Sequence, residues 1–218
     1  MRFTSPPEST TAITDFILGC LAIFFLCMIR SFRDRDPLKV RVWSWIFGLL
    51  AAASFLGTAV HGLVMGQDTL VALWMPLAFL LGMMVSVFVI GVMYDWKGAA
   101  VLKKAAGTMI SLGIAFFAVM FVLSKTVPNF FIIFIAYSGA AMLFSLGIYA
   151  YLAAARRNAA PALMAAGIAA VIAGSALQAA GSISFTLAWE FDYNSAYHFL
   201  VMAAAALFYC GIRKSAKA

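Results

Sequence analysis

Two histidines and a cluster of carboxyl and amide groups are the residues of this chain whose types could do chemistry. The ten residues 189–198 carry two carboxylates, an amide and a histidine: Glu190, Asp192, Asn194 and His198. The one other histidine, His61, lies far away in the sequence, inside a different apolar run. Imidazole and carboxylate groups bind catalytic metals and serve as general acids and bases. A functional site is therefore predicted if the fold brings the two histidines together.

Helices that cross a membrane are the elements that must position these residues. The chain has 218 residues, of which 65% are hydrophobic and 11% are charged, and its mean hydropathy is +1.02. Soluble domains carry about 25% charged residues, and a helix that spans a bilayer needs about 20 apolar residues. The composition therefore predicts an integral membrane protein without a separate soluble domain. Cys20, Cys27 and Cys210 lie inside apolar runs, which predicts small buried hydrophobic residues.

Seven apolar runs are long enough to be spans, at about residues 13–30, 42–65, 70–93, 105–125, 128–153, 160–187 and 194–212. They leave residues 1–12 as a short polar tail, 13–213 as one seven-helix transmembrane domain and 214–218 as a basic tail. With the N-terminus outside, every lysine and arginine except Arg2 and Lys125 falls on the cytoplasmic side, as the positive-inside rule requires. We therefore expect an all-α bundle with its N-terminus outside and its C-terminus in the cytoplasm. The net charge of +7 comes from short loop clusters, which predicts membrane lipids and no nucleic acid as partners.

Polar side chains from five predicted spans lie at one depth, near the outer face of the membrane. The second span ends with His61, and the seventh begins with Asn194 and His198, one helical turn apart on the same face. Acids begin the first and third spans and an amide lies in the outer half of the sixth: Asp15, Asp68 and Gln178. Because polar groups in hydrocarbon need partners, we predict that five helices form one polar site.

Most of these polar residues also have a purely structural interpretation. Asp15 suits the first turn of a helix because of the helix dipole. Asp68 and Asn194 suit N-cap positions, and Gln178 suits a hydrogen bond between helices. At the opposite face, the sequence around Asp95 predicts an aromatic belt with a solvated charge. The histidines have no equally simple interpretation.

The arrangement of these residues resembles the CREST superfamily of membrane hydrolases, which includes alkaline ceramidases, progestin and adiponectin receptors and haemolysin III relatives. The shared features are an Asn-x-x-x-His that opens the last of seven helices, a small-residue face that ends in His61 on the second, and Asp68 at the start of the third. Residues 191–198 also resemble the start of the last helix in an uncharacterised group of bacterial seven-helix proteins, similar to Phe-Asn-His-Asn-Asp-Leu-Tyr-His. The resemblance implies a multi-pass protein of the bacterial plasma (inner) membrane.

The same resemblance implies a zinc site. In the superfamily, a histidine that closes the second helix and two that open the seventh hold zinc, and a zinc-bound water attacks an amide with help from an Asp and a Ser. By position, His61 and His198 match metal ligands and Asp68 matches the catalytic acidic residue. Asn194 replaces the first histidine of the pair, and Gly57 replaces the serine. Since catalytic zinc usually has three protein ligands, the third would have to be a carboxylate: Asp15, Asp68, Glu190 or Asp192.

Three functions are compatible with these residues. The first is a metal-dependent hydrolase of a lipid amide or ester. The second is a receptor-like protein without catalysis that binds a lipid or small amphiphile in the same outer pocket, where Asn194, His61, His198 and Gln178 form a hydrogen-bonding cluster. Further candidate ligand-binding residues are Asp15, Glu190 and Asp192. The third is a b-type haem protein with His61 and His198 as axial ligands, which no quinone-site signature supports. The absence of a lysine from the seventh span argues against retinal, whereas solute or proton transport remains open.

Overall fold

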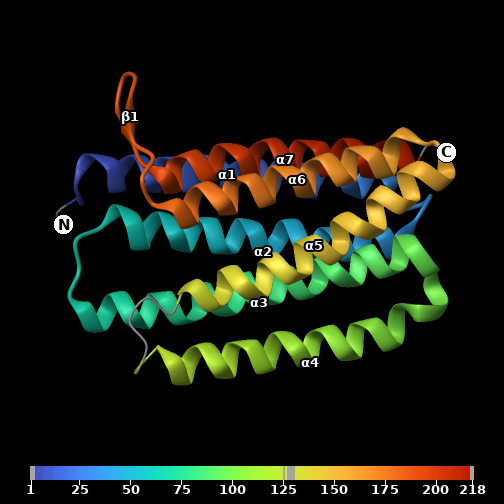
Figure 1. Ribbon diagram of the computed structural model, residues 1–218, viewed down its shortest axis with the longest axis horizontal. Helices are drawn as coiled ribbons and strands as arrows, with labels where there is room; N and C mark the ends of the chain where they lie inside the picture. The colour runs from blue at the N-terminus through green and yellow to red at the C-terminus, as the bar shows by residue number, and fades with distance from the viewer. Residues whose placement is uncertain (1–2, 125, 127–130, 217–218) are drawn as a thin grey trace.

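The computed structural model describes residues 3–124, 126 and 131–216, and these form an all-α bundle (Figure 1). The long helices of the described part are α1 (Pro6–Ile29), α2 (Pro37–Gly62), α3 (Gln67–Lys97), α4 (Ala99–Leu123), α5 (Phe131–Arg156), α6 (Ala159–Ala180) and α7 (Tyr193–Ser215). A short 3-10 helix, η1 (Arg30–Phe32), follows α1, and a hairpin of β1 (Phe185–Thr186) and β2 (Glu190–Phe191) precedes α7. Among the described residues, seven helices are long and apolar enough to cross a membrane, which confirms the predicted seven-helix bundle.

Some predicted boundaries are wrong. Helix α1 begins at Pro6, so residues 6–12 are helical and not a polar tail. Proline is favoured in the first turn because its missing N–H would have no partner there. Helix α6 ends at Ala180, well before residue 187, because Gly181 adopts a left-handed conformation with φ of 64°. Arg2 and Lys125, and residues 127–130 and 217–218, lie outside the described residues.

Six of the helices form a closed ring, in which each helix packs against the next in the order α1, α2, α3, α5, α6, α7 and back to α1. Helix α4 lies outside this ring and packs mainly against α3 (Figure 1). The order matters for the site, because α1 stands between the two helices that carry the histidines, α2 and α7.

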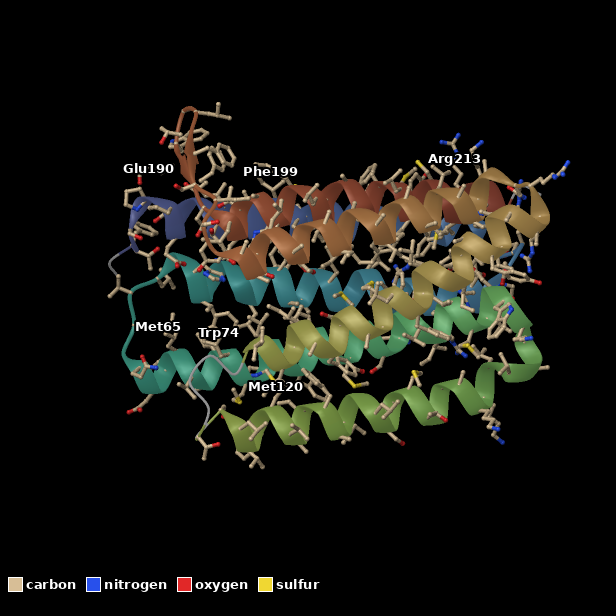
Figure 2. The ribbon with its side chains drawn as sticks, viewed as in Figure 1. Met65, Trp74, Met120, Glu190, Phe199 and Arg213 are labelled. Carbon is tan, nitrogen blue, oxygen red and sulfur yellow. The ribbon has the colours of Figure 1, made fainter. Side chains whose placement is uncertain are left out.

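The two ends of the bundle differ in chemistry. We call the end where α1, α3, α5 and α7 begin the histidine end, because it carries His61 and His198, and the opposite end the basic end. The described part of the chain begins at the histidine end and finishes at the basic end (Figure 1). Figure 2 places Trp74 and Glu190 at the histidine end and Arg213 at the basic end.

An aromatic cluster fills the middle of the ring. The ring centroid of Trp43 lies 5.5 Å from that of Phe88 and 5.5 Å from that of Phe208, and these two phenylalanines are 5.3 Å apart. Phe47 packs against Trp43 at 5.9 Å. All four side chains are buried. They come from α2, α3 and α7 and form an apolar layer between the polar residues at the two ends of the bundle.

The outer surface of the bundle is apolar. Large side chains such as Phe16, Trp45 and Leu143 are exposed on it. The three cysteines also lie there, so the expectation that they are buried is wrong. The physical reason is that lipid is as apolar as a side chain, and hydrophobicity therefore does not decide which residues of a spanning helix face inward.

Candidate functional site

A cavity of about 530 Å³ lies inside the helix ring at the histidine end. Its polar lining residues include Glu8, Asp15, Ser54, His61, Gln178, Tyr193, Asn194, Tyr197 and His198. Deeper in the bundle, its lining is apolar and includes Leu18, Leu50, Met84, Val201 and Phe208. The lining runs along α2 from His61 to Ile46, which corresponds to about 22 Å at the rise of an α-helix. The cavity is therefore long and has one polar end and one apolar end.

His198 of α7 is held by two neighbouring residues of α1. Its Nδ1 lies 2.8 Å from Oγ1 of Thr14, and its Nε2 lies 3.4 Å from Oδ1 of Asp15. All three side chains are buried, with exposed fractions of 7% for His198, 3% for Thr14 and 6% for Asp15. Asp15, in the first half of α1, is therefore a direct partner of His198.

The hydrogen bonds of Thr14 limit where protons can lie on Thr14, His198 and Asp15. The single hydroxyl proton of Thr14 goes to the carbonyl oxygen of Thr11, at 2.8 Å. His198 Nδ1 must then donate to Thr14, because the threonine has no second proton. A neutral ring protonated at Nδ1 has a lone pair at Nε2, which would repel an ionised carboxylate. One proton therefore lies between Asp15 and His198, on one or the other.

His61 of α2 has a different carboxylate partner. Its Nδ1 lies 2.8 Å from Oε2 of Glu8, which comes from the first turn of α1. The imidazole packs edge-on against the ring of Trp74 on α3, with centroids 5.8 Å apart. The backbone carbonyl of His61 accepts a 2.6 Å hydrogen bond from the hydroxyl of Thr4. The segment expected as a polar tail therefore positions one of the two histidines.

Gly57 lies directly beneath the carboxyl group of Asp15. A Cβ atom at position 57 would lie 2.9 Å from Cγ of Asp15 and would overlap its Oδ2. The place at which the CREST resemblance leads one to expect a serine is thus filled by a carboxylate from the neighbouring helix. Helix α1 supplies that carboxylate, and the glycine at position 57 leaves the space that the buried Asp15 side chain occupies.

Gln178 and Asn194 join the ends of α6 and α7 across the cavity. Nε2 of Gln178 donates to Oδ1 of Asn194 at 3.0 Å, and both residues line the cavity. Of the predicted ligand-binding residues, these two and Asp15 are brought together with the histidines. Asn194 is not the N-cap of α7.

Asp192 is that N-cap. Its Oδ1 accepts hydrogen bonds from the backbone N–H of Ser195 at 2.8 Å, from the hydroxyl of Ser195 at 3.0 Å and from the hydroxyl of Thr11 at 2.8 Å. These contacts tie the start of α7 to α1. Asp192 does not line the cavity, so its position indicates a structural role.

Asp68 and Glu190 lie away from the cluster. Asp68 is exposed in the first turn of α3, and Glu190 is exposed on the hairpin that precedes α7. Neither lines the cavity. The buried carboxylate beside a histidine is Asp15, not the predicted Asp68, because α1 rather than the start of α3 lies between α2 and α7.

Two residues of the cluster were not predicted, Glu8 and Thr14. Glu8 falls in the polar stretch before the first apolar run, and Thr14 is the second residue of that run. The available signal was the pairing of Pro6 with Glu8, because proline followed by an acid is typical of a helix start. That signal would have extended the first helix and placed its polar face beside the other polar residues.

The side chains as they lie do not fit the implied metal and haem sites. Among residues 3–124, 126 and 131–216, no group of three His, Cys, Asp or Glu side chains is placed to hold a metal ion. Both ring nitrogens of His198 face α1, and Nδ1 of His61 faces Glu8. A metal-bound imidazole must direct an unprotonated nitrogen at the ion, and so must an axial haem ligand. His198 has no ring nitrogen left for this, whereas His61 keeps its Nε2.

The helices and the cavity define a multi-pass helical membrane protein with a polar-ended cavity between its helices. Within this class, residues 10–217 match the model of a family of unknown function, DUF6962, and the chain belongs to that family. No curated protein and no solved structure matches the chain. The similarity to the CREST superfamily stays a prediction.

Proposed function

We propose that this protein binds a single-chain amphiphile between its helices, with the polar head at the histidine end and the chain directed at the aromatic cluster. The polarity of the cavity supports this most directly, because most hydrogen-bonding groups gather at one end and the rest of the lining is mainly apolar. A volume of about 530 Å³ lies within the range of about 300–1,000 Å³ that is usual for ligand pockets.

The head group is one that donates hydrogen bonds. The lining carries the carboxylates of Glu8 and Asp15, and no lysine or arginine is among the described lining residues. An anionic head would meet the Glu8 carboxylate and the Asp15–His198 pair, which shares one proton, without a lysine or arginine to balance its charge. An amine or a hydroxyl would instead find acceptors there. We therefore favour an amine or alcohol over a fatty acid.

We also infer that the basic end faces the cytoplasm and the histidine end faces outward, in the plasma membrane of a bacterium. The distribution of lysines and arginines supports this orientation through the positive-inside rule. The cavity would then take its ligand from the outer leaflet or the outer aqueous phase.

Thermal unfolding of the purified protein in nanodiscs tests the binding proposal. We expect hexadecylamine and hexadecanol to raise the unfolding temperature and hexadecanoate to leave it unchanged, because a ligand that binds only the folded state stabilises it. Ala205→Phe would fill the deep part of the cavity, since Ala205 lines it. Ala203→Phe on the same helix is the matched control, because Ala203 is exposed on the outside.

The ligand-induced shift should disappear in Ala205→Phe and persist in Ala203→Phe. An equal shift in the two variants would mean that the amphiphile acts through the surrounding bilayer, and no shift in the wild type would overturn the proposal. Asp15→Asn should weaken the amine more than the alcohol, because it removes a carboxylate from the polar end.

Hydrolysis of the bound amphiphile is a second candidate, and the contact between Glu8 and His61 favours it. A carboxylate at Nδ1 holds the proton there and leaves Nε2 of His61 able to accept a proton from water. The substrate would be a long-chain amide or ester with its scissile bond at the polar end of the cavity. Release of hexadecanoate from N-hexadecanoyl and O-hexadecanoyl substrates, followed by mass spectrometry, tests this candidate.

We expect release by the wild type and by Glu190→Gln, and none by His61→Gln. Metal analysis of the same preparation separates this chemistry from that of the CREST resemblance, because His61 and Glu8 need no metal to activate water. Stoichiometric zinc, or a loss of activity on chelation, would mean that a metal activates the water and that the Glu8–His61 pair does not act alone. Amphiphile binding without any release would overturn the hydrolase candidate and leave the binding proposal intact.

A further inference from the structure

A second cavity, of about 200 Å³, lies at the basic end, on the other side of the aromatic cluster. Its polar lining residues are Lys39, Asp95, Tyr149, Arg156, Asn158 and Ser215. Asp95 was expected as a solvated charge, but its side chain is only 11% exposed. One water in the liquid takes about 30 Å³, so the space accommodates several atoms beyond the lining. Amphiphile binding at the histidine end uses none of these residues.

The charges around this cavity are not balanced. Nζ of Lys39 lies 2.8 Å from Oδ1 of Asp95, and the hydroxyl of Tyr149 donates to Oδ2 of the same carboxylate at 2.8 Å. Both oxygens of the Asp95 carboxylate are therefore engaged, and its negative charge is balanced by Lys39. Arg156 contacts only the backbone carbonyl of Asp95, at 3.1 Å. Its positive charge has no acidic partner among the described residues, which leaves the site with a net charge of one positive unit.

Hydrogen-bond donors exceed acceptors around the same space. Lys39 has three N–H groups, and the described contacts to Asp95 and Ser215 use two of them. Ser215 accepts from Lys39 at 2.6 Å, so its own hydroxyl proton is free to point elsewhere. Arg156 is exposed at the edge of the cavity, and one of its five N–H groups is used by the described contacts, so the others are open to water or to a ligand. A ligand that completes this site must therefore bring acceptor atoms.

The beginning of helix α6 adds to the positive potential. Ala160 and Pro161, in its first turn, line the cavity. The side chain of Asn158 caps this helix by accepting from the backbone N–H of Ala160 at 2.9 Å. The amino end of a helix carries a partial positive charge, and here it faces the same space as the Lys39 ammonium and the Arg156 guanidinium.

We infer that the cavity at the basic end binds a phosphate-type anion through Arg156, Lys39 and Ser215. A phosphate group offers several acceptor oxygens and a negative charge, which matches the excess of donors and the unbalanced guanidinium. The group is supplied either by the head of an anionic phospholipid in the adjacent leaflet or by soluble phosphate. Basic pockets between transmembrane helices commonly hold anionic lipid heads.

The Lys39–Asp95 pair alone does not explain these features. A purely structural ion pair needs only its own charges balanced and its groups hydrogen-bonded, and the contacts with Tyr149 and Ser215 already engage both oxygens of Asp95 and two of the three N–H groups of Lys39. The added arginine and the 200 Å³ of space beside it are what a ligand site requires. The site is independent of amphiphile binding, because the aromatic cluster lies between the two cavities.

Two measurements on the full-length protein test this inference and identify the source of the phosphate. The ³¹P line width of inorganic phosphate, titrated at constant ionic strength with protein in a neutral detergent, reports binding of the soluble anion. Native mass spectrometry after incubation with equal amounts of phosphatidylglycerol and phosphatidylcholine reports binding of the lipid head. Arg156→Gln removes the unbalanced charge, and Arg213→Gln is the matched control because Arg213 is exposed at the same end and does not line the cavity.

We expect Arg156→Gln to weaken binding about tenfold, as the loss of a charge-assisted hydrogen bond should, and Arg213→Gln to leave it unchanged. Ser215→Ala should give a smaller loss. Broadening of the phosphate signal assigns the site to a soluble anion, and selective retention of phosphatidylglycerol assigns it to a lipid head. No binding of either ligand, or equal losses in the two arginine variants, would overturn the inference.

Discussion

The carboxyl group of Asp15 on α1 occupies the space above Gly57 on α2, so these two residues exclude a side chain at position 57. The CREST resemblance leads one to expect a serine at this position, beside a zinc-bound water. In this chain the carboxylate takes that place and faces His198. The relationship accounts for the departure at Gly57, because a serine at position 57 and Asp15 in its observed position cannot coexist unless the Asp15 side chain or one of the helices moves.

Gly57→Ser should therefore destabilise the protein by about 1–3 kcal/mol, the usual cost of overpacking a well-packed site. Gly48→Ser on the same helix is the control, because a Cβ at position 48 meets nothing within 4 Å. Unfolding by denaturant in detergent measures both. Adding Asp15→Ala to Gly57→Ser should recover part of the loss, since the overlap is then removed; additive losses would show that the two residues do not compete for space.

Asp192→Ala should lower stability by about 1–2 kcal/mol, because it removes the N-cap of α7 and the acceptor of the Thr11 hydroxyl. Glu190→Ala, two residues earlier, should change nothing measurable, because Glu190 is exposed on the hairpin. The midpoint of thermal unfolding compares the two variants. If both lose stability equally, the hairpin rather than the cap holds the start of α7.

The Lys39–Asp95 pair should behave as a buried ion pair. Lys39→Met should cost about 3–5 kcal/mol, because it leaves the carboxylate of Asp95 buried without a counter-charge. Lys39→Met combined with Asp95→Asn should cost less than Lys39→Met alone, since no charge is then unpaired and the introduced amide oxygen still accepts from Tyr149. A double-mutant cycle on the free energy of unfolding tests this, and independent, additive losses would contradict a direct pairing.

The proposed orientation predicts which cysteines an impermeant reagent can reach. In a variant without the three native cysteines, Leu187→Cys on the hairpin should react with a membrane-impermeant maleimide in intact cells. Lys103→Cys, near the start of α4, should react only after the cells are opened. The reverse pattern would place the histidine end in the cytoplasm.

The amino-acid sequence by itself determined the seven helices and the depth at which His61, Asn194 and His198 lie. Hydropathy and helical periodicity are local properties, so spacing along the chain is enough to reveal which spans exist and which residues share a level. The same reasoning correctly joined Gln178 to the polar end. It failed at Pro6, because a polar helical turn carries little hydropathy signal.

Only the tertiary structure decided which residues face one another. Asp15 and Asp68 begin different spans with similar local patterns, yet Asp15 is buried beside His198 and Asp68 is exposed. The difference comes from the lateral order of the helices, in which α1 lies between α2 and α7. That order depends on packing between small and large side chains across helices, such as Gly57 against Asp15, and such contacts join residues that the one-dimensional pattern keeps apart.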